Sequence, residues 1–366
     1  MKPRPDPYQW IGAILGLVFL ALLAYTQRDR FLPGQNDFVQ LYAGSQLSGT
    51  PQLYEPEASK AVHMRVLGVW LQSVYYSRPP FYAFFLRPLG MLPYPVAYWT
   101  FQFCSMLALA GFLRIWAPRC RELLIFASLC LPMLSTLLTG QDLMFALLAA
   151  ALSIESMRRG NDFAAGLLLS ICAIKIHLFA LTPIPLLFHR RWNVLAGGTA
   201  GGAVLLVTSF LSDGWDWPQR YLKLLSNPDL HPGAEHMPTL RGLVFSLTGQ
   251  ERAWLLTVLS VCVALLVALL AFRASLELGL AYSLIGGLLI GYHAYLQDCA
   301  ILLLPFVLVL QNTKWVPLRG AMALALTPPL YLFLMAGQPY SAVVPIALIA
   351  LLILASFRPA EAPQPA

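Results

Sequence analysis

Residues 163–188 read FAAGLLLSICAIKIHLFALTPIPLLF, an apolar run that carries Lys175 and His177 near its centre. The run exceeds the roughly 20 residues that a membrane-spanning helix needs. As a single helix it would hold Lys175 at mid-bilayer, at a cost of about 2.5–3.5 kcal/mol. As two short spans that meet at Lys175-Ile176-His177, it brings the lysine to the membrane surface. This choice decides the topology of every later segment.

Similar apolar runs recur almost from end to end of the chain. Apolar residues make up 58% of the 366 residues and charged residues 11%, whereas soluble domains contain roughly 25% charged residues. The composition predicts an all-α polytopic membrane protein, a single domain over residues 1–366 without an internal repeat. The run at 81–113 is interrupted by prolines, so we expect part of it to be re-entrant. The expected segments are about 10–25, 81–113, 123–139, 143–154, 163–188, 194–211, 253–272, 275–293, 299–311, 320–336 and 341–357.

Lysines and arginines lie in short clusters between these runs, the pattern of cytoplasmic loops. The net charge of +7 therefore does not indicate nucleic-acid binding. If 163–188 forms two spans, all the clusters fall on one side of the membrane. We expect a bundle of about twelve (ten to thirteen) transmembrane or partly re-entrant helices, with both termini cytoplasmic. The clusters are Arg114/Arg119/Arg121, Arg158/Arg159, Arg190/Arg191, Lys314/Arg319 and Arg358.

This topology makes two large loops extracytoplasmic. The first, 27–80, is expected to hold amphipathic helices, one of them at 57–76, and the second is 212–252. The run at 10–25 has no small-residue cleavage site and is followed by basic residues, so we expect a retained first helix. The six cysteines form no CxxC motif, so neither a disulfide framework nor a zinc site is indicated.

Polar side chains gather on the predicted outer face, which suits a substrate with an apolar tail and a charged head. Asp37 is the candidate general base, because a carboxylate at the membrane surface can accept a proton from an incoming hydroxyl. Lys175 or Arg78 can neutralise a phosphate group. The outer-face residues are Asp37, Tyr54, Arg78, Gln141, Asp142, Lys175, His177, His293, Gln297 and Asp298.

Five segments between about 35 and 310 resemble, in the right order, those of glycosyltransferase family 87, a bacterial branch of the GT-C superfamily. The chain departs from that family at His177 and by the missing Lys-Pro step after Lys175, and again at Arg78, which stands directly before Pro79-Pro80 where the family often has a neutral or aromatic residue. The resemblance implies a protein of the bacterial plasma membrane. The segments read NDFVQLYAGSQLSGTPQLYEPEA, YYSRPPFYAFFLRPLGMLPYPVAYW, GQDLMFALLAAAL, AAGLLLSICAIKIHLFALTPIPLLFHRRW and GYHAYLQDCAILLLP.

The resemblance implies a hexosyltransferase, with a mannosyltransferase as the first expectation. It would move a sugar, with inversion, from a polyprenyl-phosphate donor to a hydroxyl of a glycan, glycolipid or lipoglycan acceptor at the extracytoplasmic face. It implies that Asp37 is catalytic. Neither a cofactor nor a divalent metal is expected. The expected substrate-binding residues are Lys175, Arg78, Tyr54, His177, Gln141 and Asp298.

Simpler interpretations of these residues stay open. Asp37 and Asp298 can cap the helices that follow them, and Gln141-Asp142 can be a turn and cap. Lys175 can be a lysine whose ammonium reaches the interface, and Arg78 can anchor the turn at Pro79-Pro80. His231 and Glu235 have the spacing of metal ligands, but Pro232 and Gly233 argue against a helix there.

Two other functions also remain open. A transporter or flippase for a lipid-linked sugar would show internal repeats and polar groups along a central path. A membrane scaffold without catalysis would leave Asp37 dispensable.

Overall fold

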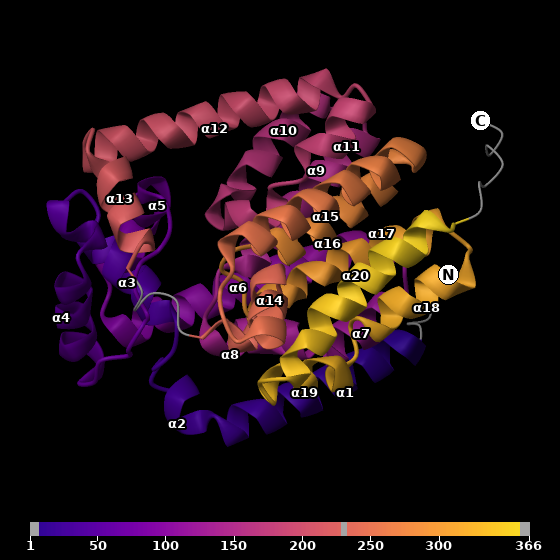
Figure 1. Cartoon of the computed structure of the whole chain (residues 1–366). Helices are drawn as coiled ribbons and strands as arrows, with labels where there is room; N and C mark the ends of the chain where they lie inside the picture. Colours follow the sequence, from indigo (N-terminus) through magenta and orange to yellow (C-terminus); the bar gives the residue numbers. More distant parts are fainter. Residues whose placement is uncertain (1–6, 228–232, 359–366) are drawn as a thin grey trace, which may run out of the picture.

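The structure is a computed structural model that describes residues 7–227 and 233–358, and within these ranges all regular structure is helical (Figure 1). Many of the helices begin with proline in their first turn, where the missing N–H costs nothing. The α-helices of the first half are α1 (Pro7–Thr26), α2 (Arg28–Phe31), α3 (Phe38–Leu47), α4 (Pro56–Leu67), α5 (Pro80–Gly90), α6 (Tyr94–Trp116), α7 (Glu122–Leu129), α8 (Leu131–Thr139), α9 (Leu143–Arg158) and α10 (Asp162–Ser170).

The later α-helices continue the bundle to residue 356. They are α11 (Pro183–Phe188), α12 (Trp192–Asp213), α13 (Trp217–Leu225), α14 (Leu240–Thr248), α15 (Ala253–Arg273), α16 (Leu276–Ile290), α17 (Leu303–Asn312), α18 (Val316–Leu324), α19 (Pro328–Met335) and α20 (Val343–Ser356). Short 3₁₀ helices are η1 (Pro51–Tyr54), η2 (Ile171–Phe179), η4 (Ala234–His236), η5 (Leu296–Leu302) and η6 (Tyr340–Ala342).

Four helical segments of the described chain are long and apolar enough to cross a membrane, or six if two bent pairs each count as one span. The expected count of about twelve is therefore not confirmed. Proline-containing breaks divide two of the other apolar runs, one of them between α7 and α8, which are bent by 56°. The four segments are Tyr94–Trp116, Asp162–Phe179, Trp192–Asp213 and Ala253–Arg273.

The run at 163–188 is interrupted at Lys175, whose φ of −132° and ψ of 46° are not helical. The sequence predicted a break at this residue, although Asp162–Phe179 together qualifies as one candidate span. Before the break, α10 packs closely on α12 through glycines. A Cβ atom added to Gly166 would lie 2.1 Å from the carbonyl oxygen of Val194, so only glycine allows this approach.

The segment 27–80 packs on the bundle. Helix α3 is buried, and its Phe38 ring lies 5.0 Å from that of Phe101 on α6. The amphipathic helix expected at 57–76 ends early, because α4 stops at Leu67 and Gly68 follows in the left-handed conformation with φ 69°. The residues after Gly68 form an irregular loop that reaches α5.

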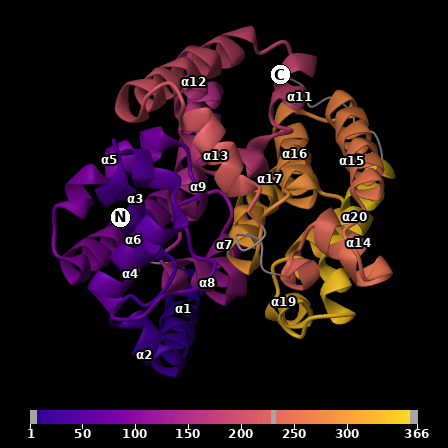
Figure 2. The same cartoon turned by 60° about the vertical axis from the view of Figure 1, so that its left-hand side comes forward.

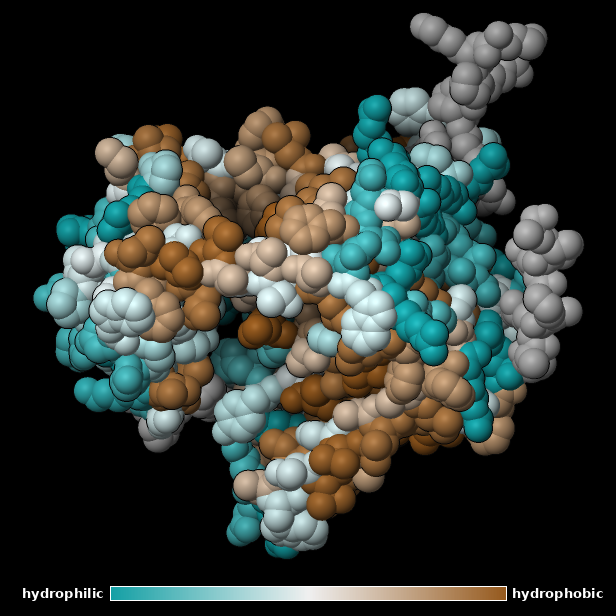
Figure 3. All heavy atoms as spheres, turned by 90° about the horizontal axis from the view of Figure 1, so that it is seen from above, coloured by the Kyte–Doolittle hydropathy of each residue, from teal (hydrophilic) through white to brown (hydrophobic). Residues whose placement is uncertain are grey.

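The helices form two groups that pack against each other at the centre of the molecule. Figure 2 shows the early helices, up to α8, on one side and α14, α15, α19 and α20 on the other, with α12 across the top. Figure 3 shows an apolar band between more hydrophilic surfaces at the left and right of the view, with a hollow in the band toward the left-hand part. This band, together with the candidate spans, indicates an integral membrane protein.

Candidate functional site

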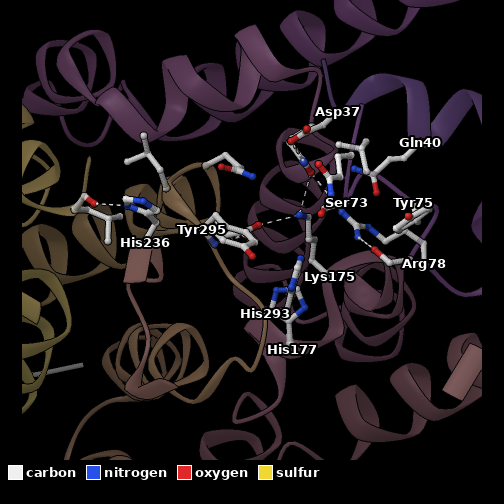
Figure 4. Close-up of a pocket in the computed structure, with 18 of the residues that line it drawn as sticks. Asp37, Gln40, Ser73, Tyr75, Arg78, Lys175, His177, His236, His293 and Tyr295 are labelled. Atoms are coloured by element: carbon white, nitrogen blue, oxygen red, sulfur yellow. Dashed lines mark hydrogen bonds and ion pairs between the residues drawn. The ribbon is translucent and has the colours of Figure 1, made fainter. Parts of the chain in front are cut away.

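A cavity of about 480 Å³ collects polar side chains from distant parts of the chain (Figure 4). In the figure Asp37, Arg78 and Lys175 lie on one side of the cavity, and His236 lies on the opposite side. Six of the seven residues proposed from the sequence line it: Asp37, Arg78, Gln141, Lys175, His177 and Asp298.

Two buried ion pairs form one wall. Arg78 Nε lies 3.0 Å from Asp142 Oδ2, and Lys175 Nζ lies 2.8 Å from Asp298 Oδ1. Lys175 Nζ also lies 3.5 Å from Asp142 Oδ1, which joins the pairs into a network. All four side chains are buried, so removing one partner would leave a charge without compensation.

Gln141 connects this network to Asp37. Its Oε1 accepts hydrogen bonds from Arg78 Nη2 at 3.3 Å and Lys175 Nζ at 3.2 Å. Its Nε2 donates to Asp37 Oδ2 at 2.7 Å. Since both cations can only donate, they determine which end of the amide faces Asp37.

The turn that carries Gln141 depends on Gly140. This residue ends α8 in the left-handed conformation, with φ 67°. A Cβ atom here would lie 2.7 Å from the Cβ of Phe38, so a larger residue would push α3 away. The glycine thus brings Gln141 and Asp142 against the start of α3.

Asp37 does not cap α3 through its side chain. The neighbouring Asn36 performs that role, since its Oδ1 accepts the Phe38 N–H at 3.1 Å. Asn36 is itself held by its Nδ2, which donates to the Leu138 carbonyl at 2.9 Å. The Asp37 carboxylate is therefore directed to the cavity and Gln141. Burial raises its pKa above the ordinary value, although the Gln141 hydrogen bond and the charges of Lys175 and Arg78 oppose this increase.

Asp298 has two roles, because one oxygen contacts Lys175 and the other accepts the Tyr295 N–H at 3.0 Å. Asp298 thus lies within the first turn of η5 and caps the N–H of Tyr295, instead of preceding a helix that begins at Cys299, and its contact with Lys175 places it in the cavity wall.

Tyr54, by contrast, does not line the cavity. The Tyr54 hydroxyl donates a hydrogen bond to the Arg78 carbonyl at 2.9 Å. Tyr54 thus holds the backbone of Arg78, whose side chain lines the cavity.

Sequence reasoning assigned Asp142 to a turn and missed its ion pairs, whose partners are far away in the chain. It also did not select three ring-bearing residues that line the cavity, His236, His293 and Tyr295. The His293 and Tyr295 rings are 4.9 Å apart, edge to face, and His236 Nδ1 contacts the Leu334 carbonyl at 3.2 Å. Their positions in the predicted outer loops were the sequence feature that could have marked them as candidate site residues.

His231, considered above as a metal ligand, lies outside the described residues. Among residues 7–227 and 233–358, three or more His, Cys, Asp or Glu side chains do not come together in a way that could hold a metal ion.

Comparisons with known proteins place the chain in a family. No curated protein and no solved structure matches it. The family model of glycosyltransferase family 87 matches residues 76–296, which is more than half of the chain and includes Arg78, Gln141, Asp142 and Lys175. The chain therefore belongs to glycosyltransferase family 87 and is a membrane glycosyltransferase.

Proposed function

We propose that this protein transfers a hexose, with mannose as the first candidate, from a polyprenyl-phosphate donor to an acceptor hydroxyl, with inversion and at the extracytoplasmic face. Asp37 is the general base. The supporting observation is that Asp37 makes no helix cap, is oriented by Gln141, and faces a cavity whose wall carries Lys175 and Arg78.

In the proposed reaction the acceptor oxygen forms a bond to the anomeric carbon of the donor sugar. The bond from that carbon to the phosphate oxygen breaks on the opposite side, and polyprenyl phosphate leaves with the electron pair. Asp37 accepts the proton of the acceptor hydroxyl as the new bond forms. The ionised form of Asp37 is the active one, since only a carboxylate can accept this proton.

Lys175 and Arg78 stabilise the charge that develops on the leaving phosphate. Each is already paired with a carboxylate, so the phosphate joins an existing network. Asp142 and Asp298 hold the two cations in position before the donor binds. Counting Asp37, the network has three carboxylates and two cations, so a phosphate competes with these carboxylates for the N–H donors of Lys175 and Arg78.

His177 lines the same cavity, and its Nε2 is buried without a hydrogen-bond partner among the described residues. We assign it to contact with the donor, where a hydroxyl or phosphate oxygen would supply that partner. The catalytic step as proposed uses no metal, because the two cations take the place of a Lewis acid at the phosphate.

The test is sugar transfer by purified protein in nanodiscs, supplied with a panel of polyprenyl-phosphate sugars and a mixed glycan and glycolipid acceptor fraction. We expect transfer from one donor class, unchanged by a chelator, and a product with inverted anomeric configuration. Absence of transfer from every polyprenyl-phosphate sugar would exclude this donor class. Retained configuration would exclude the single displacement.

A further inference from the structure

The backbone that carries Arg78 is irregular. Residues 68–79, all of them described by the structure, connect α4 to α5 without forming a helix or a strand. Pro79 and Pro80 follow Arg78, so two backbone N–H donors are missing here, and the residue before a proline favours an extended conformation. An extended segment without a neighbouring strand needs partners for its carbonyl groups where it is buried. Those partners must come from elsewhere in the protein.

Three tyrosine hydroxyls, which we call the tyrosine clamp, donate to three consecutive carbonyls of this segment. Two of them, Tyr54 and Tyr221, belong to the two large loops, and their rings lie 5.2 Å apart. The clamp thus fixes the backbone from which the Arg78 side chain extends. The hydrogen bonds run from Tyr221 to the Ser77 carbonyl at 3.3 Å, from Tyr54 to the Arg78 carbonyl at 2.9 Å, and from Tyr76 to the Pro79 carbonyl at 2.9 Å.

Helix α13, which carries Tyr221, is held against the first large loop by Arg220. The Arg220 guanidinium donates to the Pro51 carbonyl at 3.1 Å and to the carbonyl of Asp213, the last residue of α12. The Asp213 carboxylate accepts the Gly49 N–H at 3.1 Å. Figure 1 shows α13 turning down from the left-hand end of α12. The position of Tyr221 therefore depends on how the second large loop packs on the first.

The Ser77 side chain connects this packing to the cation, because its hydroxyl accepts a hydrogen bond from Arg78 Nη1 at 3.2 Å. We propose that Tyr221 is a positioning residue for Arg78, and that the second large loop thereby sets where the guanidinium meets the donor phosphate. This inference rests on the proposed reaction, in which Arg78 contacts that phosphate. Tyr221 does not line the cavity, so it acts through the backbone of Ser77 and Arg78 and not on the substrate.

A purely structural role for Tyr221 would depend on its ring, which contacts the rings of Tyr54 and Trp217. Phenylalanine keeps these ring contacts and removes only the hydroxyl, so Tyr221→Phe separates the two roles. The matched control is Tyr331→Phe. It also removes a hydrogen bond from a tyrosine hydroxyl to a backbone carbonyl, that of Ala325, at a buried position that does not line the cavity.

Hydrogen exchange tests the clamp without any substrate. Protein in nanodiscs is labelled with deuterium, and mass spectrometry follows the peptide that covers residues 71–78. We expect exchange there to be at least twofold faster in Tyr221→Phe and in Tyr54→Phe, because loss of a hydroxyl–carbonyl bond makes local opening easier. Tyr331→Phe should exchange as the wild type does in this peptide. Wild-type exchange in both clamp variants would overturn the proposal.

Binding of farnesyl phosphate, a short polyprenyl phosphate, then links the clamp to Arg78. Isothermal titration calorimetry gives its Kd, and the donor KM gives the same comparison in active protein. We expect Tyr221→Phe to weaken binding about three- to tenfold. In an Arg78→Lys background the same substitution should change the Kd less than twofold, because a lysine ammonium on its flexible stem depends less on the backbone position than a planar guanidinium. An equal loss in both backgrounds would overturn the positioning role.

The measurements also separate this inference from the proposed reaction. If the wild type neither binds farnesyl phosphate nor transfers sugar from any polyprenyl-phosphate donor, the proposed reaction fails, and the role of Tyr221 in it fails too. If the wild type transfers sugar, and Tyr221→Phe has the Kd and the donor KM of the wild type, the reaction stands and the positioning inference fails.

Discussion

The amide nitrogen of Gln141 donates a hydrogen bond to Oδ2 of Asp37 over 2.7 Å, across 104 residues of sequence. The orientation of this amide follows from the two cations at its oxygen, Arg78 and Lys175. The groups proposed to hold the phosphate thus also orient the proposed base. Several consequences of this arrangement can be measured.

Asp37→Asn should abolish transfer while leaving the fold intact. The asparagine keeps the shape of the side chain but cannot accept the acceptor's proton, and α3 keeps its cap because Asn36 provides it. We expect the rate to fall by a factor on the order of 10²–10⁴. Initial rates with lipid-linked donor measure this, and Asp29→Asn, on an exposed carboxylate of α2, is the control. Near-normal transfer by Asp37→Asn would move the search for the base to Asp298.

Gln141→Leu should shift the acidic limb of the pH–rate profile to higher pH. The hydrogen bond from Gln141 lowers the pKa of Asp37, which burial has raised, so its loss raises that pKa further. Transfer needs ionised Asp37, and it should therefore decline at a higher pH than in the wild type and recover in alkaline buffer. The exposed substitution Gln250→Leu is the control. A uniform loss of rate at every pH would instead indicate a purely structural role.

Lys175→Met should destabilise the protein and weaken donor binding. It leaves Asp298 and Asp142 buried beside a missing cation, and breaking such a pair costs about 3–5 kcal/mol. Lys175→Arg should keep part of the donor affinity. The double variant Lys175→Met/Asp298→Asn should regain much of the thermal stability without regaining donor binding. Wild-type donor affinity in a folded Lys175→Met protein would exclude the lysine from phosphate binding.

His63 should make the protein less stable in mild acid. It is fully buried in α4, neither ring nitrogen has a hydrogen-bond partner among the described residues, and burial lowers its pKa to about 4. Between this value and the ordinary 6.5, the unfolded chain binds a proton that the folded protein does not. The free energy of unfolding should therefore fall as the pH decreases through this range, by up to about 3 kcal/mol.

Thermal unfolding at several pH values checks the contribution of His63. His63→Leu should remove this part of the pH dependence, whereas Met64→Leu, an exposed neighbour on α4, should retain it. Identical pH dependence in the wild type and His63→Leu would contradict the assignment.

The expected topology can be tested by cysteine labelling of intact cells. Exposed Cys104 and Cys262 are replaced first, since they would react themselves. Single cysteines at the exposed positions Gln52 and Ser226 should react with an impermeant maleimide from outside. A cysteine at exposed Pro118, beside a basic cluster, should react only after permeabilisation. Reversed labelling would invert the topology.

The sequence alone predicted the class of protein and selected six side chains that the fold brings around one cavity. Scarce charge and repeated apolar runs predict membrane helices because hydrocarbon excludes unpaired polar groups. The few ionisable residues that remain next to such runs are then candidates for function, which is how Asp37, Arg78, Lys175 and Asp298 were found. Composition and hydropathy act locally, so they can be read from the chain without knowing its fold.

Only the tertiary structure decided how these groups interact. It assigned the α3 cap to Asn36 rather than Asp37, and it paired Arg78 with Asp142 across 64 residues. It divided several apolar runs into short helices, which is why the predicted number of spans was not confirmed. Ion pairs, amide orientation and the tyrosine clamp depend on distances between segments that meet only after packing. Local properties such as composition and hydropathy do not predict the distances between these segments.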